Sequence, residues 1–201
     1  KQYIDDNPNA LITQMDTVYN NETTGPFIQT FKFIPSGILF ALYQTEKTST
    51  TMKNGVDTLE DILGNDVFRK YVNVLLTDRG SEFYAAKDME TGVDSTTRTR
   101  VFYCDPMQSG QKGSLENNHI QLRYILPKQT DLTSIGLINQ NSLNLVISHI
   151  NSVPVEKFGG KSPLEVASFT YHDLYEKLIS YGIKEIEKDR IVLKPYLLKN
   201  R

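Results

Sequence analysis

The sequence predicts an α/β domain with a mixed five-stranded sheet, three antiparallel strands followed by two parallel ones, and helices on both faces. Three strand-like segments follow one another near the start of the chain with no helix between them. From Thr48 onward, helical and strand-like segments alternate. This order predicts a meander joined to two parallel strands through helical connections.

The first three strands are expected in "ALITQMDTVYN", "PFIQTFKFIPS" and "ILFALYQTE", after a polar start that we expect to be frayed. Their β-branched and aromatic residues favour strands, and "PSG" marks a turn. In "TSTTMKNGVDTLEDILG", Met52, Val56, Leu59 and Leu63 have helical spacing, and Gly64 is a stop signal. A helix that crosses over the sheet here would place the fourth strand beside the first.

The remaining segments complete the predicted sheet and add helices. "YVNVLLTD" and "TRTRVFYC" are the fourth and fifth strands, separated by a short helix in "SEFYAAKDM". The polar loop "DPMQSGQKGS" leads into the helix "LENNHIQLRYIL", and further helices are expected at about 139–152, in "SPLEVASF" and in "HDLYEKLISYG". We expect one domain over residues 1–170 and a helical or mixed extension over 171–201.

Composition is that of an ordinary globular domain, with 39% hydrophobic and 23% charged residues. No apolar run approaches the roughly 18 residues of a membrane span, and no signal-like leader is recognised. A single cysteine, Cys104, excludes an internal disulfide and a cysteine-cluster zinc site. It fits a reducing compartment, as a small core residue.

The net charge of −2 hides an uneven distribution. Residues 1–96 hold 14 acidic and 8 basic residues, whereas residues 97–201 hold 14 basic and 10 acidic ones. An acidic first half suits cations and a basic remainder suits a polyanion. Ordinary solvated faces explain the same distribution equally well.

Three acids stand at the ends of predicted elements. Asp16 interrupts the first strand, Asp78 ends the fourth, and Glu116 lies in the first turns of the helix after the basic loop. Each has a simpler explanation: a solvent-facing strand residue, a turn aspartate before Gly80, and a helix-dipole acid. In the turn interpretation, Gly80 takes a positive φ; in the functional interpretation, it leaves open space for a phosphate.

The predicted strand order brings the three carboxylates to one edge of the sheet, where their repulsion calls for a cation. Mg²⁺ prefers oxygen ligands and is often shared between a few carboxylates and a substrate phosphate. Two such ions would serve an in-line phosphoryl displacement, with Mn²⁺ as a substitute. If Asp16 faced away from Asp78, Asp5 or Asp6 would be weaker candidates.

The helix that carries Glu116 has a polar stripe. His119 and Arg123 follow Glu116 at i+3 and i+7, and Lys112, Gln111 and Asn117 lie near the same approach. Such a stripe predicts contact with a phosphodiester backbone. A solvated helix face is an equally good interpretation of the stripe alone.

Four stretches of this chain resemble one family: "MDTV", "LLTDRGSEF", "FYCDPMQSGQKGSLENNHIQLRYILPKQTDL" and "HINSVPVEKFGGKSPLEV". Over about residues 10–167 they look like the catalytic core of DDE transposases of the insertion-sequence thirty type. The resemblance implies an RNase H-like fold shared with retroviral integrases. It also implies that Asp16, Asp78 and Glu116 are catalytic metal ligands in a nuclease and strand transferase. The expected setting is the bacterial cytoplasm, at the nucleoid, with homo-oligomers assembled on element ends and target DNA and no membrane association.

Two departures from the family pattern are visible. Asp78 and Glu116 are separated by 38 positions, somewhat long for the family, and Arg79 stands where the family usually has Asn. The alternatives are an RNase H-like nuclease or retroviral-type integrase that does not transpose, and a catalytically decayed DNA-binding module.

Overall fold

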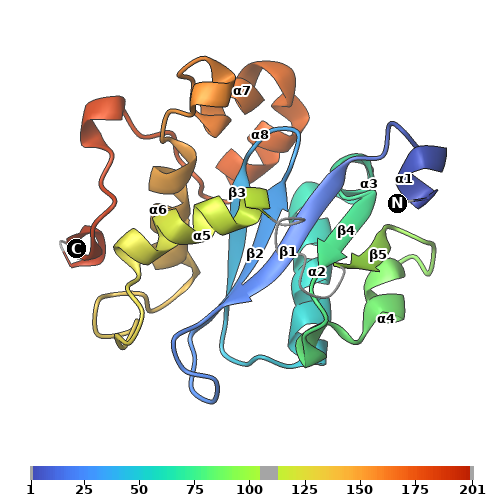
Figure 1. Ribbon diagram of the computed structural model, residues 1–201, viewed down its shortest axis with the longest axis horizontal. Helices are drawn as coiled ribbons and strands as arrows, with labels where there is room; N and C mark the ends of the chain where they lie inside the picture. Colours follow the sequence, from blue (N-terminus) through green and yellow to red (C-terminus); the bar gives the residue numbers. More distant parts are fainter. Residues whose placement is uncertain (1, 105–112, 200–201) are drawn as a thin grey trace.

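The computed structural model describes residues 2–104 and 113–199 of the 201-residue chain, and its centre is one five-stranded sheet (Figure 1). The strand order is β3-β2-β1-β4-β5. β1 is antiparallel to β2 and β2 to β3, whereas β1, β4 and β5 are parallel. The strands span Ile12–Val18 (β1), Phe27–Phe33 (β2), Leu39–Gln44 (β3), Val74–Thr77 (β4) and Arg100–Tyr103 (β5). The predicted mixed sheet, with the fourth strand beside the first, is confirmed.

One face of the sheet is polar at its centre. Gln14 of β1 is opposite Lys32 of β2, and Asp16 is opposite Thr30. Because directly paired residues share a face, all four side chains point to the same side. Helix α5 (Gly113–Ile125) lies on that side, where the backbone N–H of Leu115 donates to Gln14 Oε1 at 3.2 Å.

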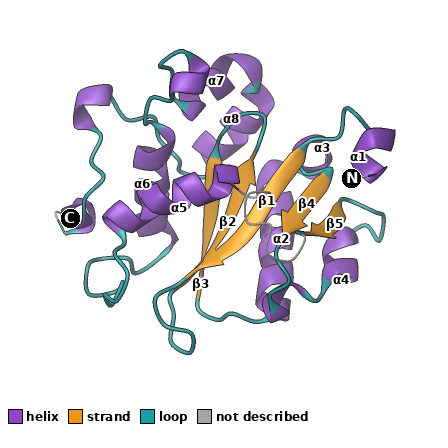
Figure 2. Ribbon diagram, viewed as in Figure 1, coloured by secondary structure: helices purple, strands orange, loops and turns teal. Residues whose placement is uncertain are grey.

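Helix α2 (Ser49–Leu63) covers the opposite face, behind the sheet in the view of Figure 2. The Gln29 side chain of β2 donates to the backbone oxygen of Met52 at 2.9 Å, which identifies the face that α2 covers. The apolar residues predicted for this helix are all buried, and Gly64 is its C-cap residue. The predicted crossover helix is thus confirmed.

Helix α6 (Gln140–Asn151) covers the outer edge of β3. The Asn151 side chain bonds both the N–H and the carbonyl of Leu39. The Gln140 side chain accepts from Tyr43 N–H at 2.8 Å and donates to Ala41 O at 2.9 Å. Unpaired backbone groups at a sheet edge invite association with other chains. Here two amide side chains form hydrogen bonds with the edge backbone groups that a sixth strand would otherwise pair.

The short elements differ most from expectation. The N-terminal segment is not frayed but forms α1 (Gln2–Asp6). Residues 65–70, for which no element was predicted, form α3 (Asn65–Tyr71) together with Tyr71, where the fourth strand was expected to begin. Phe68 and Tyr71, at helical spacing, are both buried in α3. Because Tyr71 belongs to α3, the fourth strand, β4, begins only at Val74. The predicted short helix is split into η1 (Ser81–Phe83) and α4 (Ala86–Glu90).

The C-terminal residues pack on the same core as the rest. The remaining elements are η3 (Glu156–Phe158), α7 (Pro163–Thr170), α8 (His172–Ser180), η4 (Lys188–Arg190) and η5 (Pro195–Leu198). Leu174 and Leu178 of α8 are fully buried, and Asp173 bonds Lys70 and the Tyr71 hydroxyl of α3. The expected division at residue 170 stays a prediction. Ser162 is the N-cap of α7 and Pro163 its first residue, as expected.

A smaller expectation, for Cys104, is also met. Cys104 is buried directly after β5, and its N–H donates to Thr77 O at 2.8 Å. Among the helices of the described ranges, none is long and apolar enough to cross a membrane.

Candidate active site

Asp16 and Asp78 lie at the same level of two neighbouring parallel strands. β1 and β4 pair Ile12 with Val74 and Gln14 with Leu76. Two residues further in the same register, Asp16 comes beside Asp78, which directly follows β4. Both side chains are half-buried. The sheet therefore brings together two acids that are far apart in sequence, on the face that α5 covers.

Each aspartate also accepts a local backbone hydrogen bond. Asp78 Oδ1 accepts the N–H of Gly80 at 2.9 Å, and Asp16 Oδ1 accepts the N–H of Thr17 at 2.8 Å. The bond to Gly80 is that of an Asx turn, so the simpler interpretation of Asp78 describes a real feature of the structure. It leaves the functional interpretation open, because a carboxylate has two oxygens and about four acceptor sites.

Both expectations for Gly80 are wrong. Its φ is −60°, which any residue adopts, and the space beside it is filled. A Cβ on Gly80 would lie 2.5 Å from Glu82 Oε2 and 3.1 Å from Asp78 Oδ1. A side chain at position 80 would have to displace the end of the Glu82 side chain, which is buried against this turn. Lys47 Nζ lies 3.5 Å from Glu82 Oε1 and 4.1 Å from the centroid of the Tyr19 ring.

Helix α5 is tied to the strand that carries Asp16. His119 Nε2 and Thr30 Oγ1 are 3.1 Å apart, and the Thr30 hydroxyl donates to the backbone oxygen of Asp16 at 3.1 Å. A hydroxyl has one hydrogen, so Thr30 accepts from a protonated Nε2 of His119. The predicted stripe of α5 therefore lies over β1 and β2 at the level of Asp16.

Glu116 is exposed one helical turn before His119 and lines a groove of about 500 Å³. The groove runs between α5 and the end of β1, and its walls include His119, Arg123 and Tyr19. Over residues 2–104 and 113–199, no three His, Cys, Asp or Glu side chains are grouped as they would be around a metal ion. Asp16, Asp78 and Glu116 thus lie in one region but do not converge as ligands, and their assignment stays a prediction.

Arg123 holds the chain that leaves β1. Its guanidinium donates to Asn20 Oδ1, to Tyr19 O at 3.0 Å and to Leu126 O at 3.5 Å. Burial lowers the pKa of Arg123 below its usual value. This role was not predicted from the sequence. The predicted DNA contact stays a prediction, and it would have to use the side of the guanidinium that faces the groove.

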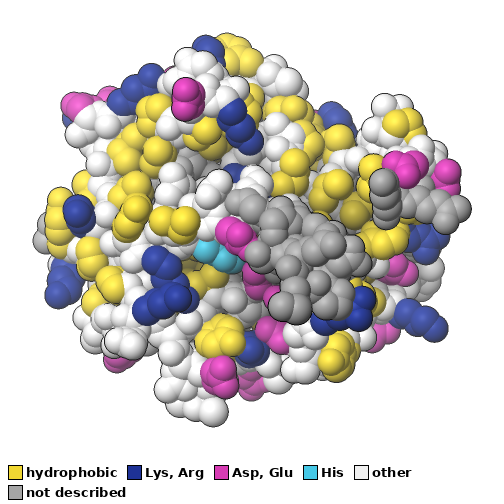
Figure 3. Space-filling view, in the orientation of Figure 1, with side chains coloured by type: hydrophobic (Ala, Val, Ile, Leu, Met, Phe, Trp, Pro, Cys, Tyr) yellow, Lys and Arg dark blue, Asp and Glu magenta, His cyan; other side chains and the backbone are white. Residues whose placement is uncertain are grey.

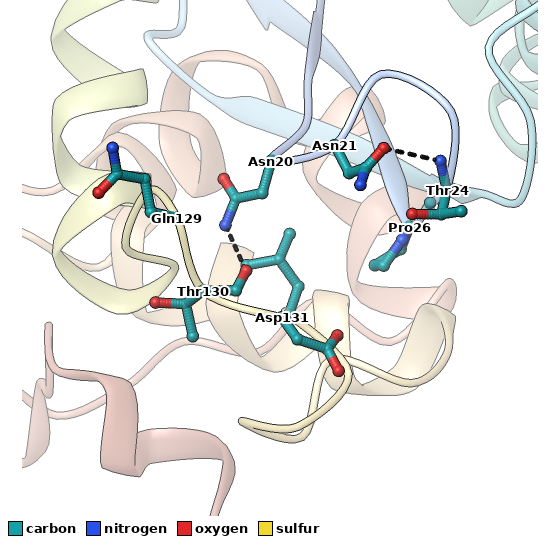
Figure 4. A pocket seen from close by; sticks show the side chains of 9 residues that line it. Asn20, Asn21, Thr24, Pro26, Gln129, Thr130 and Asp131 are labelled. Atoms are coloured by element: carbon teal, nitrogen blue, oxygen red, sulfur yellow. Dashed lines mark hydrogen bonds between the residues drawn. The ribbon is translucent and has the colours of Figure 1, made fainter.

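The hydrogen bonds of Asn20 continue into a neighbouring pocket of about 310 Å³ (Figure 4). Its side chain donates to Pro127 O and to Thr130 O, both at 2.7 Å. The loop after β1 and the loop after α5 are thereby joined through one asparagine. The Arg123–Asn20 pair thus fixes one end of the groove.

The structure also separates the predicted DNA-binding residues. Asn117 is exposed but lines a different groove, on the other side of α5 from Glu116. Gln111 and Lys112 lie outside the described residues. Lys128 and the exposed Tyr124 line the groove beside Glu116 and were not predicted. The sequence held a signal for both residues: Tyr124 lies eight positions after Glu116 on the same helix, and Lys128 follows Pro127. An exposed aromatic side chain near a basic one is typical of contacts with single-stranded nucleic acid.

On the face shown in Figure 3, a histidine, acidic side chains and a group of basic side chains lie close together. The oxygen donors of Asp16, Asp78 and Glu116 suit Mg²⁺, which needs few protein ligands because it keeps several waters. Asp16 is on a strand and Asp78 directly follows one, which holds the backbone of both in place. Glu116, on an exposed helical turn, is the donor that would have to adjust.

Comparison with known proteins gives sequence relatives of one kind. The chain matches no family model. It is 35% identical over 92 residues to the transposase for insertion sequence element IS1086 of Cupriavidus metallidurans, across 46% of this chain and 25% of the relative. It is 34% identical over 92 residues to the transposase InsI for insertion sequence element IS30A of Escherichia coli, across 46% and 22%. The chain spans about a quarter of the length of the curated relatives it matches. These homologues are IS30-family transposases, which confirms the resemblance noted in the motifs.

Solved structures of similar fold are retroviral integrase catalytic cores. The BIV integrase core has a TM-score of 0.56 at 20% identity, over 83% of this chain and 99% of that one. The HTLV-2 integrase core in complex with magnesium has a TM-score of 0.54 at 16% identity, over 78% and 95%. At these identities the likeness shows the fold alone. The fold is RNase H-like, as expected.

Proposed function

We propose that this chain is the catalytic core of a DDE transposase, which cuts DNA at the ends of a mobile element and joins the 3′ ends to target DNA. The main support is one observation. Asp16 and Asp78 lie at the same level of two parallel strands, with Glu116 on the helix above them. This arrangement occurs on an RNase H-like sheet, in a chain homologous to transposases.

Asp16, Asp78 and Glu116 would hold two Mg²⁺ ions, or Mn²⁺ as a substitute. When bound, such ions activate the attacking oxygen and stabilise the leaving oxygen of a phosphoryl transfer. An integrase core of the same fold has been solved in complex with magnesium, which supports this assignment. The attacking oxygen belongs to water in cleavage and to a DNA 3′-hydroxyl in joining. No side chain of the protein acts as a nucleophile.

The chain's other residues orient this centre. His119 holds α5 over β1 through Thr30, and Arg123 holds the segment after β1 through Tyr19 and Asn20. Lys128, at the rim of the groove, supplies a positive charge for the DNA backbone together with Lys112, and the Gln111 amide donates hydrogen bonds to it. His119, close to Asp16, affects the reaction rate more than DNA affinity.

The proposed setting is the bacterial cytoplasm, at the nucleoid, with copies of the protein assembled as oligomers on DNA. One solved structure of similar fold is a simian T-cell lymphotropic virus intasome, and HTLV-2 integrase cores have been solved in trimeric and dimeric forms. These assemblies belong to the relatives. Here they support the proposal that the chain acts as an oligomer.

The test is an assay with the full-length protein, a plasmid that carries the element ends and a target plasmid, in Mg²⁺. We expect 3′-end cleavage and joined products. Asp78→Asn and Asp16→Asn should each lower both by about a thousandfold or more, since several kcal/mol of transition-state stabilisation are lost. Asp61→Asn, an exposed acid of α2 on the other face of the sheet, is the matched control and should have no effect.

The same assay separates the alternatives. Cleavage without joined products would indicate a nuclease that does not transpose. DNA binding without cleavage in Mg²⁺ or Mn²⁺ would indicate a non-catalytic module. Two observations favour this second candidate: over the described ranges, the three acids do not form a metal-ligating group, and Arg79 stands where the family it resembles usually has Asn.

A further inference from the structure

A second groove, of about 330 Å³, lies on the other side of α5. It is bordered by the first turns of α5, the turn between β2 and β3, α6 and the segment of η3. Two lysines, Lys32 and Lys157, and three amide side chains line it. Among the described residues that form its wall, none is Asp or Glu. The charged side chains of its described lining are thus all cationic.

Lys32 is buried at the bottom of this groove, with 5% of its surface exposed. Burial, with a smaller contribution from the charge of Lys157, lowers the pKa of Lys32 from 10.5 to about 7. Within the described part of the chain, its ammonium donates one hydrogen bond, to Gly37 O. An ammonium has three donors, so one carbonyl satisfies it incompletely. A buried cation of this kind costs stability unless an anion compensates it.

The wall opposite α5 is shaped by Phe158 and Gly37. Gly37 has a φ of 72°, and a Cβ there would lie 2.8 Å from the Phe158 ring. The ring therefore packs directly on the turn whose carbonyl holds Lys32. Lys157 Nζ lies 4.6 Å from the centroid of the same ring, which keeps the second ammonium at the rim of the groove.

Asn118 adds an unpaired polar atom to the wall of the groove. Asn118 is 9% exposed; its Oδ1 has no hydrogen-bond partner in the part of the chain that the structure describes, while its Nδ2 donates to Gln121 Oε1 at 2.9 Å. Exchanging oxygen and nitrogen in both amides keeps their mutual bond. After this exchange, an N–H of Asn118 is the unpaired group. The groove thus offers two ammonium groups and an amide donor to one ligand.

We propose that this groove binds a phosphate group, and that the phosphate belongs to the backbone of DNA. Charge-assisted hydrogen bonds from lysines and amides are what a phosphate requires. The DNA assignment rests on the proposed function. Asn117 in this groove and Glu116 beside the other are consecutive residues of α5, a helix only about 10 Å across. One DNA strand that passes over the helix could reach both sides.

The first experiment uses inorganic phosphate as the probe, without metal and in EDTA, by isothermal titration calorimetry. The informative variant is Gln121→Glu, which adds a negative charge to the groove and, because a carboxylate only accepts, turns the Asn118 N–H away from the ligand. We expect it and Lys157→Ala to weaken binding about tenfold or more, as loss of a charge-assisted bond predicts. Lys177→Ala, an exposed lysine of α8, is the control for loss of one charge and should bind like the wild type.

The second experiment measures binding of a duplex of arbitrary sequence over a salt series. Lys157→Ala should shallow the slope of log affinity against log salt by about one unit, and Gln121→Glu by a similar amount. Lys177→Ala should leave it unchanged. Lys157 and Gln121 are not in the core, so both variants should fold, and circular dichroism checks this.

Each outcome decides the proposal. No phosphate binding by the wild type, or equal binding by Gln121→Glu, would overturn it. Phosphate binding that responds to these variants, with an unchanged DNA slope, would overturn the DNA assignment and indicate a free phosphate as the ligand. Neither experiment depends on cleavage, so an inactive protein can still pass this test, and an active one can fail it.

Discussion

The two faces of the central sheet differ in how their buried basic side chains are compensated. On the α2 face, Arg98 is completely buried but fully engaged: it donates to Glu60, Asp57 and the backbone oxygen of Met89, each at 2.7–2.8 Å. On the α5 face, Lys32 is almost as buried, but among the described residues no carboxylate forms an ion pair with it. Buried charges that serve only stability are normally paired. The difference indicates that the α5 face is arranged for ligands and the α2 face for folding.

The largest loss of stability is expected for a substitution on the α2 face. Arg98→Met should lower the free energy of unfolding by about 3–5 kcal/mol, because it leaves the buried carboxylate of Glu60 without its partner. Urea denaturation measures it. The double variant Arg98→Met with Glu60→Leu should recover a large part of the loss. Arg190→Met, which breaks an exposed pair with Glu187, should cost less than about 1 kcal/mol. Equal losses in Arg98→Met and Arg190→Met would contradict the comparison.

Replacing Lys32 is expected to change the free energy of unfolding in the opposite direction. In buffer without phosphate at pH 6–7, Lys32→Met should raise the free energy of unfolding by roughly 2–3 kcal/mol. The folded-state pKa of about 7 lies below the unfolded value of 10.5, so folding penalises the charged lysine fully below pH 7. Between pH 7 and 10.5 the unfolded state binds more protons, and wild-type stability rises relative to the variant. The advantage of Lys32→Met should therefore shrink toward pH 10.

Urea melts of both proteins at several pH values measure this difference. A loss of stability in Lys32→Met at pH 6 would show that the bond to Gly37 O outweighs the desolvation of the ammonium. Lys32 would then belong with Arg98 as a structural residue, and the contrast between the faces would fail.

Smaller changes are expected at the groove beside Glu116. There we expect Arg123 to contribute to stability and Lys128 to DNA binding. Arg123→Lys keeps the charge but loses most of the bonds to Tyr19, Asn20 and Leu126. It should lower stability by about 1–2 kcal/mol and leave the salt dependence of DNA binding unchanged. Lys128→Ala should do the reverse, with unchanged stability and a salt slope shallower by about one unit. A shallower slope in Arg123→Lys would instead favour a specific phosphate contact by the guanidinium.

The elements that could be predicted from the sequence are those fixed by local pattern. The α2 helix follows from the spacing of Met52, Val56, Leu59 and Leu63, and its crossover puts β4 beside β1. Helix α3 was missed because Val67, Phe68 and Tyr71 are as compatible with a strand as with a short helix. Packing against α2 and α8 decides between them.

For the site, sequence placed Asp16 and Asp78 together because strand order and register follow from topology. It could not place Lys32. In "FIQTFKF" a lysine between two phenylalanines predicts an exposed strand face, and only the position of α5 buries it. Gly80 shows the same limit, since the space beside it is filled by the Glu82 side chain, whose orientation the sequence does not reveal. The role of Arg123 in holding Tyr19 likewise depends on a contact across 104 positions.

The place of β1 in the sheet also orders events during folding. β1, β2 and β3 are consecutive and can pair once residue 44 is available, whereas β1 meets β4 only after a connection of more than fifty residues has closed. Asp16 therefore enters an early hairpin alone, and Asp78 and Glu116 arrive later. We therefore expect any repulsion among these acids to act after β1, β2 and β3 have paired, and to raise the rate of unfolding more than it lowers the rate of folding.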